Sequence, residues 1–304
     1  MDWQAFSENI NQSLKEPFSP IQIQSAQVVS GGDIHQAYQL HAAGKDYFLK
    51  LNHHQYLPLF ETERHSLNAI RHSKSITCPQ PFATGTYNDQ AWLLMAFIDL
   101  APSKQPSDEV QRGRALAQMH HQINRDIKPF GWFENNFIGL NQQHNHWHMD
   151  WIEFYGQQRL KPQLELATLR NAPTSLYPLG MELIDQLPFW FKDYSPEASL
   201  LHGDLWGGNS AFDTVGEPIF YDPACYYGDR ETDLAMTELF GGFTPDFYTG
   251  YNALYPLHAG YQSRKPLYNL YHILNHFNLF GGRYAQQAEK IIDQLLKTVQ
   301  TNDK

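Results

Sequence analysis

The sequence of 304 residues contains only two cysteines, Cys78 and Cys225. Two thiols in a chain of this length do not form a disulfide framework, so a reducing compartment, the cytoplasm, is expected. No stretch approaches the roughly 20 consecutive apolar residues that a membrane helix needs. The first four residues also lack the basic and apolar regions of a secretory signal. These absences predict a soluble cytoplasmic protein.

Basic residues are also few, with 22 lysines and arginines against 32 acidic residues and a formal net charge of −10. This balance argues against nucleic acid or an anionic membrane as the main partner, because both require a basic surface. It does not exclude ATP, since a metal ion and one or two local cations can neutralise a triphosphate. The hydrophobic content of 42% supports a buried core. A monomer is the favoured oligomeric state.

The first third of the chain is predicted to form short strands and one helix. Apolar residues between turn residues are typical of strands. Four segments show this pattern: 21–29, 37–40, 47–51 and 91–98. In residues 60–71, Phe60, Leu67 and Ile70 lie at helical spacing and predict the helix.

Helical patterns dominate after residue 106. Ser107 is predicted to cap a helix whose first turn carries Asp108 and Glu109, where acidic side chains favour the helix dipole. Further helices are predicted at 150–169, 179–191, 232–240, 266–280 and 284–300, with a strand, loop and strand at 200–222. We therefore predict an α+β, protein-kinase-like fold of two lobes. A small N-terminal lobe with an antiparallel β-sheet and one helix, 1–96, precedes a larger, mainly helical lobe, 97–304.

The strongest chemical signal is the segment His202-Gly203-Asp204-Leu205-Trp206-Gly207-Gly208-Asn209. Here Asp204 can accept the proton of an attacking hydroxyl, and the amide oxygen of Asn209 can bind magnesium. A second carboxylate, Asp222, follows an apolar strand and can present hard oxygens to the same metal. Each residue alone is more often structural, in a turn or a cap. Their order and spacing favour phosphoryl transfer.

A cation for the phosphates is expected in the N-terminal lobe. Lys50 ends an apolar strand, where a buried lysine needs a carboxylate partner. Glu63 on the following helix is the first candidate and Glu61 the second. Without the downstream carboxylates, Lys50 would be interpreted as a surface lysine at a strand end.

Two further segments are candidates for nucleotide contacts. Gly31 and Gly32 can let backbone amides approach phosphates, although they match neither phosphate-loop pattern in full and are also typical of a hairpin turn. The apolar run 93–98 can offer backbone groups to adenine, or it can be a core strand only.

The segment 202–209 resembles the catalytic loop of the fructosamine-3-kinase (ketosamine-3-kinase) family, within the aminoglycoside phosphotransferase and choline kinase clan. His-Gly-Asp and the final Asn are shared by the clan, whereas Leu-Trp-Gly-Gly is specific to the family. The likeness continues through Asp150–Tyr155, Tyr221–Ala224, Asp233–Met236, Leu239–Phe243 and Leu274–Asn278, and therefore covers nearly the whole chain.

The resemblance implies an ATP- and Mg²⁺-dependent kinase that phosphorylates the 3-hydroxyl of ketosamines, the rearranged adducts of sugars with amines. The product then breaks down and frees the amine, which is deglycation. The implied roles are Asp204 as base, Asn209 and Asp222 as magnesium ligands, Lys50 with Glu63 at the α- and β-phosphates, and backbone near Ala96 and Ile98 at adenine. Trp206 is implied as a wall for the sugar, or as a packing residue only.

Other functions stay open beside this one. A kinase for choline or an aminoglycoside lacks the Leu-Trp-Gly-Gly insert, and a nucleotide-binding pseudokinase would have lost Asp204, Asn209, Asp222 or Lys50. A protein kinase is disfavoured because His-Arg-Asp, Asp-Phe-Gly and Ala-Pro-Glu are absent. The resemblance implies a ribulosamine, erythrulosamine or fructosamine adduct, small or protein-bound, and similarity to non-animal relatives favours the first two over the third.

Overall fold

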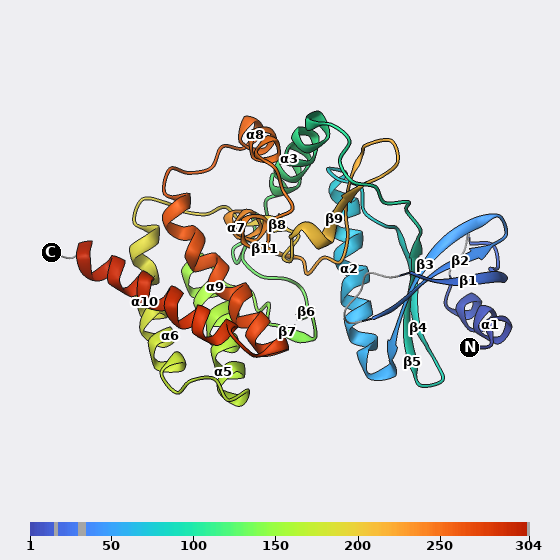
Figure 1. The fold of residues 1–304 in the computed structure, drawn as a ribbon, viewed down its shortest axis with the longest axis horizontal. Helices are drawn as coiled ribbons and strands as arrows, with labels where there is room; N and C mark the ends of the chain where they lie inside the picture. The colour runs from blue at the N-terminus through green and yellow to red at the C-terminus, as the bar shows by residue number, and fades with distance from the viewer. Residues whose placement is uncertain (15–17, 30–34, 303–304) are drawn as a thin grey trace.

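The computed structural model describes residues 1–14, 18–29 and 35–302, in which a β-sheet part is followed by a helical part (Figure 1). Gly31 and Gly32, the predicted phosphate turn, lie outside the described residues. Within these ranges, no helix combines the length and apolar character that crossing a membrane requires.

The N-terminal part is built on an antiparallel sheet of five strands in the order β1-β2-β3-β5-β4. The strands are β1 (Ile23–Val29), β2 (Gln36–Ala42), β3 (Lys45–His53), β4 (Pro81–Tyr87) and β5 (Gln90–Ala96). Between β2 and β3, Ala43 and Gly44 both have positive φ, as a two-residue hairpin turn requires. The four predicted strands are confirmed, and β4 is an additional edge strand.

Two helices cover the two faces of this sheet, α1 (Trp3–Ser13) and α2 (Leu57–Ser73). Side chains of β5 alternate between them. Trp92 and Leu94 pack with α1 in a small outer core, whereas Leu93 joins a larger core that α2 shares with the helical part. The helix predicted at 60–71 is confirmed as α2, whereas α1 was not predicted. Because α2 belongs to the larger core, it connects the sheet to the rest of the molecule.

The C-terminal part is mainly helical, so the predicted α+β fold is confirmed. Its helices are α3 (Pro106–His120), α4 (Trp151–Phe154), α5 (Lys161–Leu169), α6 (Leu176–Asp185), α7 (Glu231–Leu239), α8 (Pro245–Leu254), α9 (Tyr261–Phe280) and α10 (Tyr284–Asn302). A π-helical turn, Tyr155–Leu160, joins α4 to α5. Short 3-10 segments are His54–Tyr56, Leu187–Phe191 and Gly207–Asn209.

Three pairs of short strands lie between these helices. They are β6 (Asn136–Ile138) with β7 (Asn141–Gln143), β8 (Ser199–Leu201) with β11 (Tyr226–Gly228), and β9 (Ser210–Phe212) with β10 (Pro218–Phe220). The predicted catalytic segment, residues 202–209, follows β8, and Asp222 follows β10. The division at residues 96 and 97 stays a prediction.

The start of α3 differs from its predicted start. Ser107 was expected to be the cap, but the helix begins at Pro106 and Gln105 is the residue before it. The carboxylate of Asp108 accepts a hydrogen bond from the backbone N–H of Gln105 at 3.1 Å. Proline is favoured as the first residue of a helix, and the third residue, Asp108, bonds back to Gln105. This arrangement takes the place of the predicted serine cap.

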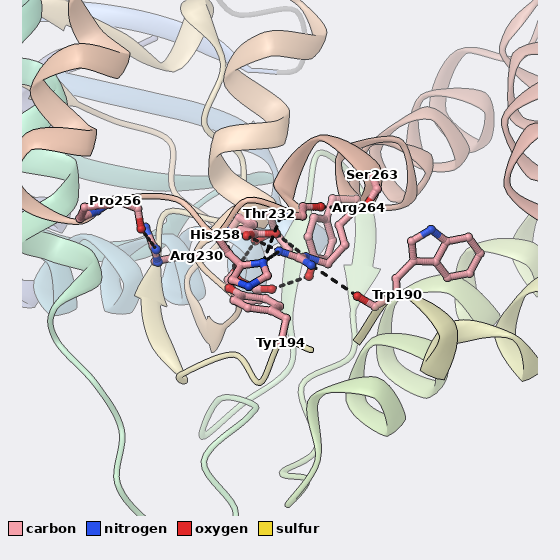
Figure 2. A network of polar contacts seen from close by, with 12 residues as sticks. Trp190, Tyr194, Arg230, Thr232, Pro256, His258, Ser263 and Arg264 are labelled. Atoms are coloured by element: carbon pink, nitrogen blue, oxygen red, sulfur yellow. Dashed lines mark hydrogen bonds and ion pairs between the residues drawn. The ribbon is translucent and has the colours of Figure 1, made fainter. Parts of the chain in front are cut away.

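A buried ion pair fixes α7 to α9. Arg264 donates to both carboxylate oxygens of Glu231, at 2.7 and 2.8 Å, and both residues are almost completely buried. Figure 2 shows that Arg264 also lies against the ring of Tyr194 and donates to the carbonyl oxygen of Trp190. Because both side chains are buried away from water, their mutual attraction and these hydrogen bonds compensate for the lost hydration of the two charges.

Replacing Arg264 with Met should therefore lower the free energy of unfolding by about 3–5 kcal/mol, because Glu231 is left as an uncompensated buried charge. Urea denaturation monitored by circular dichroism measures the change. The neighbouring Lys265 forms a partly exposed pair with Glu238 and is the matched control. Lys265→Met should cost less than about 1 kcal/mol. Equal costs for the two variants would contradict this account.

Candidate active site

The Lys50 ammonium occupies the junction between the sheet, α2 and the segment after β10. Its Nζ lies 2.7 Å from Oε1 of Glu63 and 2.6 Å from Oδ1 of Asp222, and only 6% of the residue is exposed. Burial alone would lower the pKa of Lys50, but the charges of Asp222 and Glu63 outweigh burial and raise it. Of the two glutamates considered, Glu63 makes the contact. Lys50 is therefore held as a cation that faces the cleft.

The loop after β8 depends on one buried carboxylate, that of Asp233 in α7. Its oxygens accept hydrogen bonds from the backbone N–H groups of His202 at 2.7 Å and Gly203 at 2.9 Å, and from His120 at 3.1 Å. Burial would raise the pKa of Asp233, but these hydrogen bonds and the nearby histidines lower it. Asp233 belongs to one of the segments that resemble the family, but its supporting role was not predicted from the sequence.

Gly203 is needed where the loop turns. Its φ is +83°, and a Cβ there would lie 2.1 Å from the carbonyl oxygen of Ala224. Only glycine accommodates both the left-handed conformation and the close approach of a second backbone segment. This turn brings the next residue, Asp204, to the cleft.

Asp204 and Asn209 face each other across the loop. The Asn209 amide donates to the Asp204 backbone carbonyl at 2.8 Å and to its Oδ2 at 3.1 Å. Burial and the charge of Asp222 raise the pKa of Asp204 to about 7, although the hydrogen bond from Asn209 opposes the rise. Because the amide nitrogen of Asn209 is used in this way, its amide oxygen is left to bind another group.

Asp222 has a φ of +56°, which is unusual for a residue other than glycine. The residue before it, Tyr221, accepts a hydrogen bond through its carbonyl oxygen from Nε2 of the fully buried His202, at 3.0 Å. The Asp222 side chain is 45% exposed and contacts Lys50 through Oδ1. The two loops are therefore joined, and both acidic side chains face the same space.

That space is a cavity of about 340 Å³. Six of the predicted site residues line it: Lys50, Glu63, Asp204, Trp206, Asn209 and Asp222. On the helical side its wall includes His276 and Phe280 of α9. Trp206 is 39% exposed as a residue, and its ring covers Gly208, where a Cβ would lie 2.2 Å from the ring. The geometry thus gathers a cation, four oxygen-bearing side chains and an exposed aromatic ring around one cleft.

Comparison with known proteins identifies the family. The fructosamine kinase family model matches residues 2–298. A probable ketoamine kinase of Vibrio parahaemolyticus is 40% identical over 294 residues, which is 97% of this chain and 99% of that protein. This chain belongs to the fructosamine kinase family.

Other members and more distant structures agree with this family. The chloroplastic protein-ribulosamine 3-kinase of Arabidopsis thaliana is 40% identical over 270 residues, covering 88% of this chain and 82% of that protein. The crystal structure of a fructosamine-3-kinase candidate from Haemophilus somnus has a TM-score of 0.86 at 27% identity, over 97% and 98% of the two chains. An aminoglycoside phosphotransferase with ADP and hygromycin B has a TM-score of 0.65 at 14% identity over 98% of each chain, and shares the fold alone.

Two side chains of this site offer oxygens of the kind that magnesium binds. Asn209 and Asp222 offer an amide oxygen and a carboxylate, both hard ligands. Among the described residues, no group of three or more histidine, cysteine or acidic side chains is arranged to hold a metal by itself. A magnesium ion at Asn209 and Asp222 therefore needs oxygens from phosphate and water to complete its shell, as is usual for nucleotide-bound magnesium.

Two residues predicted to contact adenine, Ala96 and Ile98, are not among the described residues that line this cavity. Ala96 lines a different cavity, of about 680 Å³, and its N–H already donates to the carbonyl oxygen of Gln80 at 2.8 Å. Ile98 is not among the described residues that line either of these two cavities. Conversely, His35 lines the active-site cavity without having been predicted. Its only sequence signal is its position between the glycine pair and β2.

The raised pKa of Asp204 predicts a cost in stability. The native carboxyl titrates at about 7 and the unfolded one at about 3.9, so the native state binds the proton more tightly and ionised Asp204 destabilises the fold at high pH. Each pKa unit between the native and unfolded states corresponds to about 1.4 kcal/mol of unfolding free energy. Partial exposure of Asp204 to solvent makes the actual contribution smaller. Asp204→Asn should therefore raise the free energy of unfolding by about 1–3 kcal/mol at pH 8 in the nucleotide-free protein.

Urea denaturation of both proteins at pH 8, 6.5 and 5 tests this expectation. The advantage of the variant should shrink as the pH falls from 7 toward 4. Asp193 is exposed, and Asp193→Asn serves as the control, with a change below about 0.5 kcal/mol. An Asp204→Asn protein that is less stable than the natural one at pH 8 would contradict the assignment of a destabilising carboxylate.

Proposed function

We propose that this protein is an ATP-dependent ketoamine kinase that phosphorylates the 3-hydroxyl of the sugar portion of its substrate. The observation that carries the proposal is the meeting of Asp204, Asn209 and the Lys50–Asp222 pair at one cavity. Members of the same family named for ketoamine and ribulosamine phosphorylation support it. The fold shared with a phosphotransferase crystallised with ADP supports ATP as the donor.

Asp204 is the general base in this proposal. A carboxylate whose pKa lies near 7 is about half ionised at neutral pH, and its ionised form is basic enough to take a proton from a hydroxyl. The amide of Asn209 fixes the carboxylate by its hydrogen bond to Oδ2. The attacking hydroxyl of the substrate is therefore oriented and deprotonated by the same loop.

Lys50, Asn209 and Asp222 hold the nucleotide end of the site. Magnesium-bound ATP supplies the phosphoryl group together with positive charge that offsets the phosphate charge. We assign Asn209 and Asp222 to the metal and Lys50, oriented by Glu63, to the α- and β-phosphates. Adenine is assigned to the backbone near Ala96 and Ile98, through groups other than the Ala96 N–H, which is already bonded.

The ketoamine is assigned to the aromatic side of the cleft. The Trp206 ring packs at 6.4 Å from Phe240, and Phe280 on the same cavity wall is 59% exposed. Exposed aromatic faces can bind the apolar face of a sugar and the cationic amine beside it. A ribulosamine or erythrulosamine is the proposed sugar adduct, and the exposed rim is compatible with either a small amine or a protein amine as its carrier.

The cytoplasm is the proposed compartment, and both cysteines fit a reducing environment. Cys78 and Cys225 are buried and unpaired. Burial raises the pKa of the Cys78 thiol to about 12 and that of Cys225 well above its ordinary value, so neither is a reactive thiolate at neutral pH.

A substrate panel tests the proposed activity. ATP consumption is measured with ribuloselysine, erythruloselysine, fructoselysine, choline and kanamycin. Turnover is expected with the ketoamines, and Asp204→Asn should lower kcat by roughly 10²–10⁴-fold with ATP affinity largely kept. Activity on choline or kanamycin alone would refute the proposed substrate class, and undiminished turnover of the variant would refute the base assignment.

Asp222→Asn tests the metal site separately. Loss of the negative charge should weaken ATP binding at limiting magnesium by at least about tenfold, the lower end of what disturbing a metal ligand costs. Isothermal titration with ATP at several magnesium concentrations measures the effect. Glu217→Gln removes an exposed carboxylate from the β9–β10 hairpin that precedes Asp222, and it should leave ATP affinity unchanged. Unchanged affinity for Asp222→Asn at low magnesium would remove Asp222 from the ligand set.

A further inference from the structure

His35 is a histidine of the cavity to which the proposed chemistry gives no role. It precedes β2 and lines the same cavity as Lys50 and Asp222. Its ring packs against Phe60 of α2, with centroids 5.0 Å apart. The side chain is half-buried. It is therefore held in one place beside the charged groups without forming an ion pair with them.

A cross-strand contact determines which ring nitrogen of His35 carries the proton. Strand pairing puts Gln36 opposite Leu51, so one further step puts His35 opposite Asn52. The Nδ2 amide nitrogen of Asn52 lies 2.9 Å from Nδ1 of His35. An amide nitrogen only donates, so Nδ1 must accept, and the proton of the neutral ring must be on Nε2.

The surroundings keep this ring neutral. Burial, and then the charge of Lys50, lower the pKa of His35 to about 4, although the Asp222 carboxylate opposes the effect. A second proton on Nδ1 would also face the Asn52 amide donor. At neutral pH His35 therefore offers one N–H donor and no net charge.

The position of His35 along the sheet indicates what it can reach. On β3, Tyr47 pairs with Ala96, at the end proposed for adenine, and Lys50 follows at the proposed α- and β-phosphates. Asn52 lies two residues beyond Lys50, about 7 Å farther from Ala96 at the usual rise of a strand. His35 is opposite Asn52 and so lies at the end of the cavity where a triphosphate extended along β3 would end.

We propose that the Nε2–H of His35 donates a hydrogen bond to the terminal phosphoryl group of bound ATP. The proposal rests on the nucleotide orientation given under the proposed function. A neutral donor lets the protein recognise the third phosphate without adding a charge next to Lys50. His35 is then a residue through which the site distinguishes ATP from ADP.

Two substitutions separate the two ring nitrogens of His35. In His35→Asn, the side-chain oxygen can replace Nδ1 as the acceptor for Asn52, but no donor remains at the Nε2 position. In His35→Gln, the longer amide can place its nitrogen near the Nε2 position. Binding of AMP-PNP and of ADP, each with magnesium, is measured by isothermal titration calorimetry.

His35→Asn should weaken AMP-PNP binding by about 10- to 100-fold, the usual cost of losing a hydrogen bond to a charged group, with ADP affinity kept within about twofold. His35→Gln should recover most of the AMP-PNP affinity. His41→Asn, at an exposed histidine of β2 that pairs with Asp46, is the control and should leave both affinities unchanged. Thermal unfolding verifies that each variant folds, and His35→Ala replaces the Asn variant if that one does not.

Unchanged AMP-PNP affinity in His35→Asn would overturn the proposal, and so would an equal loss of AMP-PNP and ADP affinity. Nucleotide binding is measured without any ketoamine. If no ketoamine is turned over but AMP-PNP binding still depends on His35, only the proposed substrate class is refuted. Ketoamine turnover without that preference would refute the role of His35 alone.

Discussion

The burial of one ammonium group, that of Lys50, is the constraint on which the active-site architecture depends. A buried cation is tolerated only with well-placed carboxylates, and Lys50 has two, Glu63 from α2 and Asp222 from the segment after β10. The sheet, the helix and the catalytic part of the chain must therefore meet at one point. The core that α2 shares with the helical part holds this meeting point together.

Much of the fold could be predicted because the signals are local. The strands of the sheet except β4, helix α2 and most later helices follow from apolar periodicity. Helix α1 is short and mostly polar, and its apolar side chains find partners only on the far face of the sheet. Strand β4 begins with Pro81 and contains Gly85, which disfavour a strand prediction but are tolerated at a sheet edge.

The site could be predicted only in part, because its support is not local. The residues around Asp204 lie in one segment, and their spacing already indicates phosphoryl transfer. Lys50 and Asp222 are in contact although they are 172 positions apart in the sequence. Asp233 and His202, which form a hydrogen bond, are 31 positions apart. The tautomer of His35 depends on Asn52 across the sheet. No spacing rule reaches such pairs, and the resemblance of the whole chain predicted neither the supporting role of Asp233 nor the place of His35.

The contact between Lys50 and Asp222 also has a thermodynamic consequence for nucleotide binding. In the nucleotide-free protein, the carboxylate proposed for the metal neutralises the lysine proposed for the phosphates. If magnesium and nucleotide bind together, Asp222 exchanges Lys50 for the metal ion, and Lys50 exchanges Asp222 for a phosphate. Both side chains are already partly desolvated by their contact, so the added desolvation cost of binding is small. A metal ion alone at Asp222 would leave Lys50 with Glu63 as its one remaining carboxylate, and nucleotide alone at Lys50 would leave Asp222 without its cation. On the proposed assignments, the Lys50–Asp222 ion pair would thus make the binding of metal and nucleotide mutually dependent.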